Sequence, residues 1–206
     1  MVRFDSRLQR QAALSIVIAL WVPAVGFGIR TLLRYANTPG RSAVAPERWP
    51  AKTSLVAAIG RSTLLLFVHP QCGCSRATIG ELAHIIACCS REVDATVLFY
   101  APKSMPKEWV QGDLRENATA IPGVRVLDDP DGNTARQFGV HTSGQTLLYD
   151  AGGRLVFQGG ITASRGHSGD NAGRDTITAL LAGQTPHRPA TPVFGCALLD
   201  ENQGLN

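Results

Sequence analysis

The chain has 206 residues, of which 44% are hydrophobic and 17% charged, a composition that suits a folded globular protein and excludes a disordered or fibrous one. Its net charge of +4 comes from basic residues scattered singly, without a dense basic stripe between aromatic residues, so we expect no nucleic-acid partner. Five cysteines are an odd number, so at least one stands outside any set of intramolecular pairs.

An uncharged run at residues 12–29 is the first predicted element. Its 18 residues are at the lower limit for a helix that crosses a hydrocarbon layer of about 30 Å. A signal peptide would need a cleavage site, but the small residues 42–45 lie too far from the run. A buried core helix would normally show a polar face, and this run has none. We therefore predict an uncleaved membrane anchor over residues 1–34.

The anchor predicts a single-pass membrane protein with its domain outside the cytoplasm. Positive charges flank both ends of the apolar run in similar numbers, so they do not fix the orientation. The orientation rests instead on the usual behaviour of N-terminal anchors with a short basic head. Residues 35–52, rich in Pro, Gly, Ser and Ala, are predicted to be a tether.

The predicted domain, residues 53–186, alternates strand-like and helix-like segments. A continuously apolar run at 63–69 is typical of a buried strand, and the apolar residues after it recur at helical spacing. The elements that follow are a strand at 95–101, a helix at 106–120, a strand at 124–129, a short helix at 131–140, a hairpin at 145–160 and a helix at 172–183. This order predicts an α/β fold with parallel strands first and an antiparallel edge.

Two cysteines one residue apart, Cys72 and Cys74, lie between the first predicted strand and its helix. A helix N-terminus favours the thiolate, the form of cysteine that reacts. Gly73 permits the unusual backbone angles of a short Cys-Gly-Cys ring, and residues i and i+2 lie within the roughly 7 Å that a disulfide needs. Such a ring is strained and therefore labile, which favours exchange chemistry. The alternative is that both cysteines only pack in the core.

A cysteine at the end of the first strand, in this order of elements, resembles the thioredoxin-like superfamily over residues 63–160. Cys72 matches the nucleophilic cysteine and Ser75 the second one, so the family's C-x-x-C is Cys-Gly-Cys-Ser here. The Gly-Val-x-x-x-x-x-Thr-Leu-Leu hairpin is similar to the family's, with Gly144 in the place of its cis-proline. The resemblance implies a three-layer fold with a mixed central sheet after the transmembrane helix, and Ser143 and Gly144 beside the substrate.

The function implied is a membrane-tethered thiol–disulfide oxidoreductase that acts on protein thiols or disulfides without a cofactor. The resemblance also implies that the anchor lies in the inner membrane and the domain in the periplasm. Cys72 attacks, and Cys74 or Cys196 resolves. Cys196 belongs to a C-terminal segment, 187–206, which either docks on the domain or is a tail of no consequence. The resemblance also places the loop 161–171 beside Cys72.

Several polar side chains are candidates for this site. His167 is the candidate general acid or base, because the ordinary pKa of histidine lies near neutral pH, and Arg165 is a candidate for substrate binding. His69, three residues before Cys72, is expected to stabilise its thiolate and to bind substrate. A solvated loop is the alternative for the first two, and packing at a strand end for His69.

A copper site is the alternative function. Cys72 and Cys74 with His167 or His69 would suit Cu(I), since thiolates select soft metals. The peroxidase motif Pro-x-x-x-Thr/Ser-x-x-Cys is not present before Cys72. Leu65 stands where the motif needs Pro, and His69 where it needs Thr or Ser. Cys88 and Cys89, on the predicted helix, are expected to be small buried residues, with a vicinal disulfide as the alternative.

Overall fold

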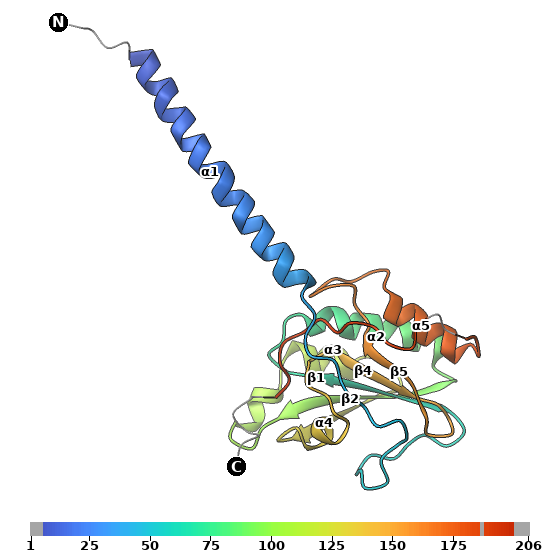
Figure 1. Cartoon of the computed structure of the whole chain (residues 1–206). Helices are drawn as coiled ribbons and strands as arrows, with labels where there is room; N and C mark the ends of the chain where they lie inside the picture. The colour runs from blue at the N-terminus through green and yellow to red at the C-terminus, as the bar shows by residue number, and fades with distance from the viewer. Residues whose placement is uncertain (1–5, 186–187, 200–206) are drawn as a thin grey trace, which may run out of the picture. The chain divides into compact units, whose positions relative to one another are not determined.

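A computed structural model describes residues 6–185 and 188–199. The chain divides into two units, residues 1–37 and 38–206. The first unit contains the helix α1, Ser6–Asn37 (Figure 1). Its stretch Gln9–Asn37 is long and apolar enough to cross a membrane, and none of it is buried within the structure. The helix is longer than the predicted apolar run because the flanking arginines continue it.

The second unit contains a five-stranded mixed sheet in the order β3-β2-β1-β4-β5. The strands are β1 (Ser62–Val68), β2 (Val93–Ala101), β3 (Val124–Pro130), β4 (Gln145–Tyr149) and β5 (Leu155–Gly160). β1, β2 and β3 run parallel, whereas β4 is antiparallel to both β1 and β5. The predicted mixed sheet with an antiparallel edge is thereby confirmed.

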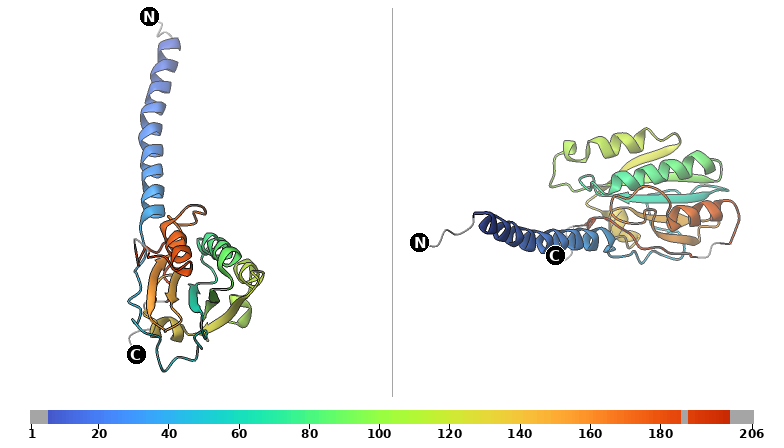
Figure 2. Two further views of the ribbon diagram at one scale, coloured as in Figure 1. Left: turned by 90° about the vertical axis from the view of Figure 1, so that its right-hand side faces the viewer. Right: turned by 90° about the horizontal axis from the view of Figure 1, so that it is seen from above.

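Helices cover both faces of the sheet (Figure 2). They are α2 (Ser75–Cys89), the 3-10 helix η1 (Lys107–Val110), α3 (Asp113–Thr119), α4 (Asn133–Gln137) and α5 (Ala172–Leu181). Apolar residues of α2, α3 and α5 share one core cluster with Leu64 and Leu66 of β1. Phe138, which follows α4, shares the other with Leu65 and Phe67. β1 is therefore buried on both faces, as its continuous apolar sequence predicts.

One predicted helix is interrupted. Residues 106–120 form η1 and α3 rather than a single helix. Gly112 separates them with φ 141° and ψ −177°, a backbone conformation outside the helical region that glycine adopts most readily.

The predicted tether is joined to the domain by contacts that begin at Gly40. Gly40 donates to the carbonyl of Val193, and Trp49 makes edge contacts with Phe138 and Tyr149 at ring distances of 5.4 and 5.2 Å. Ala43 is buried. Composition alone suggested a free linker, but these contacts join most of the segment to the second unit.

The C-terminal segment also packs on the domain, and we call residues 189–198 the strap. Its first part runs along β5, with a parallel bridge between Gln158 and Ala190. Its second part lies beside the loop before β4: Ser143 donates to the carbonyl of Cys196 at 2.9 Å, and Leu198 donates to that of His141 at 2.8 Å. The strap thus covers the outer edge of β5 and brings Cys196 to the end of β1.

Candidate active site

Cys72 lies in the short connection between β1 and α2. Tight turns shape this connection: Cys72 donates to the carbonyl of His69 at 3.0 Å, and Ser75 donates to that of Cys72 at 2.9 Å. The helix begins at Ser75, with Cys74 as its N-cap residue. Cys72 is therefore close to the N-terminus of a 15-residue helix, as the sequence predicts, but only 1% of it is exposed.

The sulfur atom that contacts the Cys72 sulfur belongs to a cysteine near the far end of the chain. The Cys72 and Cys196 sulfur atoms are 3.1 Å apart, although the two residues are separated by 124 positions. Gly195 permits this approach, because a Cβ atom there would lie 1.9 Å from the carbonyl oxygen of Ser143. The strap can therefore follow the loop 141–144 closely only with glycine before Cys196.

The surroundings of Cys72 favour its ionised form. Burial raises the pKa of the thiol, but hydrogen bonds from Ser75, Cys196 and Ser143 outweigh this effect, so the pKa is lowered. The two serine hydroxyl oxygens are 2.8 Å apart, and Ser143 also accepts the backbone N–H of His69 at 2.8 Å. A network that joins β1, α2 and the loop before β4 thus stabilises the thiolate.

The other two thiols of the site behave in the opposite way. Burial and the neighbouring Cys72 raise the pKa of Cys196 to about 12. Burial and Cys72 also raise the pKa of Cys74, although Arg165 opposes the shift. When one thiol of the cluster ionises, it is therefore Cys72 that loses its proton, while Cys196 keeps its own.

Gly144 occupies the position that the resemblance gave to a cis-proline. The described residues contain no cis peptide bond, and Gly144 has φ +89°. Its N–H donates to the carbonyl of Phe67 at 2.7 Å, at the end of β1. Glycine suits this position because the backbone conformation is left-handed and Thr78 would lie 3.2 Å from an added Cβ atom.

Of the three polar side chains predicted for the site, Arg165 has contacts that tie it to the cysteine cluster. Arg165 donates to the carbonyl of Gly195 and acts electrostatically on Cys74 and Cys196, so it belongs to the site. His167 is exposed in the same loop, and its proposed role as acid or base stays a prediction. His69 packs its ring against Trp109 and Tyr100, at 5.3 and 5.9 Å.

Glu81 is a site-supporting residue that sequence reasoning missed. It lies on α2, is 1% exposed, and binds Arg174 of α5 at 2.7 Å. It also accepts the N–H of Gly169 and the side chain of Asn171 at 2.8 and 3.3 Å. The carboxylate therefore holds the loop that carries Arg165 against α2. An acidic residue between apolar positions of the helix was the available signal.

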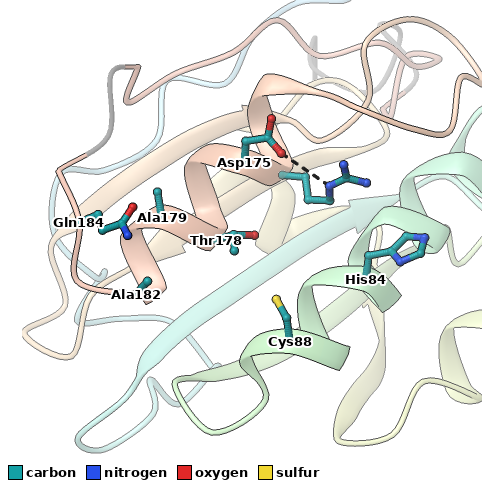
Figure 3. A pocket seen from close by; sticks show the side chains of 8 residues that line it. His84, Cys88, Asp175, Thr178, Ala179, Ala182 and Gln184 are labelled. Carbon is teal, nitrogen blue, oxygen red and sulfur yellow. Dashed lines mark ion pairs between the residues drawn. The ribbon is translucent and has the colours of Figure 1, made fainter.

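The second pair of cysteines lies at the other end of α2. Cys89 is buried, as predicted, whereas Cys88 is exposed, contrary to the prediction, because it faces the groove between α2 and α5 instead of the core. Figure 3 shows Cys88 and His84 on α2 opposite Thr178 and Ala179 of α5 and Ala182, the residue that follows this helix. The groove encloses about 480 Å³ and none of the residues that line it belongs to the Cys72 site.

Comparison with known proteins bears on the fold. No family model and no curated protein matches the chain. A hypothetical protein from Sinorhizobium meliloti is 18% identical, with a TM-score of 0.56 over 80% of this chain and 96% of that one. An uncharacterised conserved protein from Geobacillus kaustophilus is 16% identical, with the same TM-score over 80% and 93%. An exposed lipoprotein thioredoxin from Streptococcus pneumoniae is 18% identical, with a TM-score of 0.42 over 60% and 85%.

The sheet order, the antiparallel β4–β5 edge and the cysteine after β1 decide the fold class. The fold is thioredoxin-like. Within this thioredoxin-like domain, Ser75 stands where the family's second cysteine is expected, and its hydroxyl is a hydrogen-bond partner of Cys72 instead of a redox partner. The thiol next to Cys72 is supplied by the strap.

Proposed function

We propose that the protein is a membrane-tethered thiol–disulfide oxidoreductase whose redox couple is Cys72 and Cys196. The observation that carries the proposal is the 3.1 Å separation of the two sulfur atoms. A small rotation of either side chain brings sulfurs at this distance to the roughly 2.05 Å of a disulfide bond. The thioredoxin-like fold and the lowered pKa of Cys72 support the same conclusion.

The couple exchanges two electrons with a partner. When the Cys72–Cys196 bond forms, two thiols lose two electrons and two protons, and a partner disulfide accepts them to become two thiols. In the reverse direction the Cys72–Cys196 disulfide is reduced and a partner dithiol becomes a disulfide. Protein thiols and disulfides are the proposed partners, and no cofactor is required.

The proposed location is the inner membrane, with the domain in the periplasm. The support is α1, whose 29-residue stretch Gln9–Asn37 extends about 43 Å as a helix, more than the roughly 30 Å of a hydrocarbon core. An oxidising compartment suits a disulfide couple better than a cytosol that keeps thiols reduced. Labelling of intact cells with a membrane-impermeant thiol reagent tests the orientation: Cys88, which is exposed, reacts from outside the inner membrane if the proposal holds.

The function is tested with the full chain in detergent. After mild oxidation, peptide mapping is expected to find a Cys72–Cys196 disulfide, and the oxidised chain is expected to convert a dithiol peptide to its disulfide. Cys72→Ser removes both results. Cys88→Ser is the matched control, because Cys88 lies outside the couple. Oxidised chain that lacks the Cys72–Cys196 bond contradicts the proposal.

The alternative, a Cu(I)-binding module of Cys72, Cys74 and His167, has weaker support. His167 is exposed, and in residues 6–185 and 188–199 no three side chains of the His, Cys, Asp and Glu types converge as a metal site. Titration of the reduced chain with Cu(I) distinguishes the two functions: stoichiometric binding together with an absence of disulfide exchange favours the copper module.

A further inference from the structure

The two sulfurs of the proposed couple differ in their access to solvent. Cys72 is 1% exposed, whereas Cys196 is half-buried. The hydroxyl partners of Cys72, on Ser75 and Ser143, are themselves 1% and 0% exposed, so no path from solvent passes them. A partner that approaches the closed domain therefore meets Cys196 before Cys72.

The strap is firmly held on both sides of Cys196. Val193 and Leu198 are 0% and 2% exposed, and Thr142 forms a bridge with Ala197. Lifting the strap to uncover Cys72 would expose both apolar side chains and break the hydrogen bonds of Cys196 and Leu198 with the loop 141–143. Exchange at Cys196 requires no such opening.

We propose that partner thiols enter through Cys196, so that the mixed disulfide forms on the strap and Cys72 is the leaving group. This inference rests on the proposed function. It assigns to Cys196 the role that the family resemblance gives to the cysteine after β1. In thiol–disulfide exchange the attacking sulfur approaches along the S–S axis, and of the two cysteines only Cys196 is partly exposed to an incoming thiolate.

The chemistry of the leaving group agrees with this direction. A partner thiolate attacks the Cys196 sulfur, the Cys72–Cys196 bond breaks, and its electron pair stays on Cys72. Ser75 and Ser143 stabilise that thiolate, and their hydrogen bonds help to lower the pKa of Cys72. Thiols with a low pKa leave faster, whereas expulsion of Cys196, with a pKa of about 12, is slow.

A second thiol of the partner completes the reaction. It attacks the partner's sulfur in the mixed disulfide, forms the partner's own disulfide and releases Cys196, which takes up a proton. Because Cys196 is the poorer leaving group, this second step is the slower of the two. The partner has lost two electrons and two protons. The couple has gained the two electrons and the proton on Cys196, and the other proton goes to Cys72 or to solvent. A partner disulfide of more oxidising potential regenerates the Cys72–Cys196 bond by the reverse steps.

Cys74 is the other half-buried thiol near Cys72. It is not part of the Cys72–Cys196 bond, so an incoming thiolate has no disulfide sulfur to attack there. A mixed disulfide on Cys74 would require Cys74 itself to attack first, and the raised pKa of its thiol opposes that step.

The experiment uses the full chain in detergent, oxidised until the Cys72–Cys196 disulfide is mapped. Glutathione is added as a monothiol probe, the reaction is stopped with acid at early times, and the adduct is located by mass spectrometry. Trypsin separates the candidates, because Cys72 lies in the peptide 62–76 and Cys196 in the peptide 175–206. Cys74→Ser, studied in parallel, leaves one cysteine in the first peptide.

We expect about tenfold or more glutathione on Cys196 than on Cys72 in both chains, because exchange follows access and the leaving group. Glutathione that appears first on Cys72, or on Cys74 in the wild-type chain, overturns the inference while leaving the redox couple intact. Failure to form the Cys72–Cys196 disulfide at the start overturns the proposed function as well. The two failures are therefore distinguishable.

Discussion

The two pairs of cysteines at opposite ends of α2 have similar sulfur separations and very different surroundings. The sulfurs of Cys72 and Cys196 are 3.1 Å apart, and those of Cys88 and Cys89 are 2.7 Å apart. Hydrogen bonds lower the pKa of Cys72, whereas burial raises the pKa of Cys89 to about 12. The 3.1 Å separation therefore supports the proposed Cys72–Cys196 couple together with the lowered pKa of Cys72, because the surroundings decide which sulfur is ionised.

Backbone geometry adds a second difference. Cys72 and Cys196 come from separate segments, so a bond between them closes a long loop with little demand on local angles. Cys88 and Cys89 are adjacent in a helix, and a disulfide between them would distort the last turn of α2. We therefore expect the first pair to exchange and the second to remain reduced.

The largest expected effect follows removal of the strap sulfur. Cys196→Ser leaves Cys72 without a partner, so oxidation of a dithiol peptide by the full chain is expected to fall to the rate without protein. Cys88→Ser is expected to keep the wild-type rate. The measurement is the amount of peptide disulfide formed with time. Equal loss in both variants would mean that the two pairs do not differ as described.

Glu81 ties the loop of Arg165 to α2, between the two pairs. Glu81→Ala leaves the buried partners of the carboxylate unsatisfied and is expected to cost about 3–5 kcal/mol of unfolding free energy. Glu81→Gln keeps the shape and part of the hydrogen bonding, so its loss should be smaller. Denaturant unfolding measures both. An unchanged midpoint for Glu81→Ala contradicts the account of this buried carboxylate.

Gly195→Ala tests whether the close packing of the strap places Cys196. The added methyl group would lie against the Ser143 carbonyl, so the strap shifts and Cys72 becomes accessible. We expect faster alkylation of Cys72 and slower formation of the Cys72–Cys196 disulfide. Gly73→Ala is the control: its Cβ atom meets nothing within 4 Å, although Gly73 lies next to Cys72. Identical behaviour of the two variants would contradict the packing argument.

Ser75→Ala is expected to have a smaller effect, which is limited to the ionisation of the Cys72 thiol. Loss of the hydroxyl hydrogen bond raises the pKa of Cys72 toward its ordinary value. At a pH between the two values, the thiolate fraction therefore falls. Ultraviolet absorbance of the thiolate during a pH titration measures this change. Ser90→Ala, next to the other cysteine pair, serves as control, and a Cys72 titration that Ser75→Ala leaves unmoved would refute the role of Ser75.

The smallest effect concerns access within the second pair. Native chain treated with iodoacetamide is expected to be labelled at Cys88 and protected at Cys89, because Cys88 is exposed and Cys89 is 8% exposed with a pKa of about 12. Mass spectrometry before and after unfolding distinguishes the two. Rapid labelling of Cys89 in the folded chain would contradict the description of Cys89 as buried.

Local sequence predicted the strands, most helices and the position of Cys72. The continuous apolar run of β1 and the helical spacing after it are local properties, and they are visible without the fold. Gly112 divided one predicted helix through a backbone angle that composition does not reveal. Burial of Cys88 was predicted wrongly, because the last turn of a helix decides whether a small residue faces the core or a groove.

The contacts between distant segments could not be predicted in the same way. The sequence by itself determined a thioredoxin-like order of elements, an apolar N-terminal helix and a cysteine at the start of α2, because periodicity and composition are properties of short windows. Tertiary structure alone decided that Cys196 lies at Cys72, that Ser75 and Ser143 share its hydrogen bonds, and that residues 40–49 contact the domain instead of being free. These arrangements depend on backbone pairing over more than a hundred residues, and no local pattern specifies such a register.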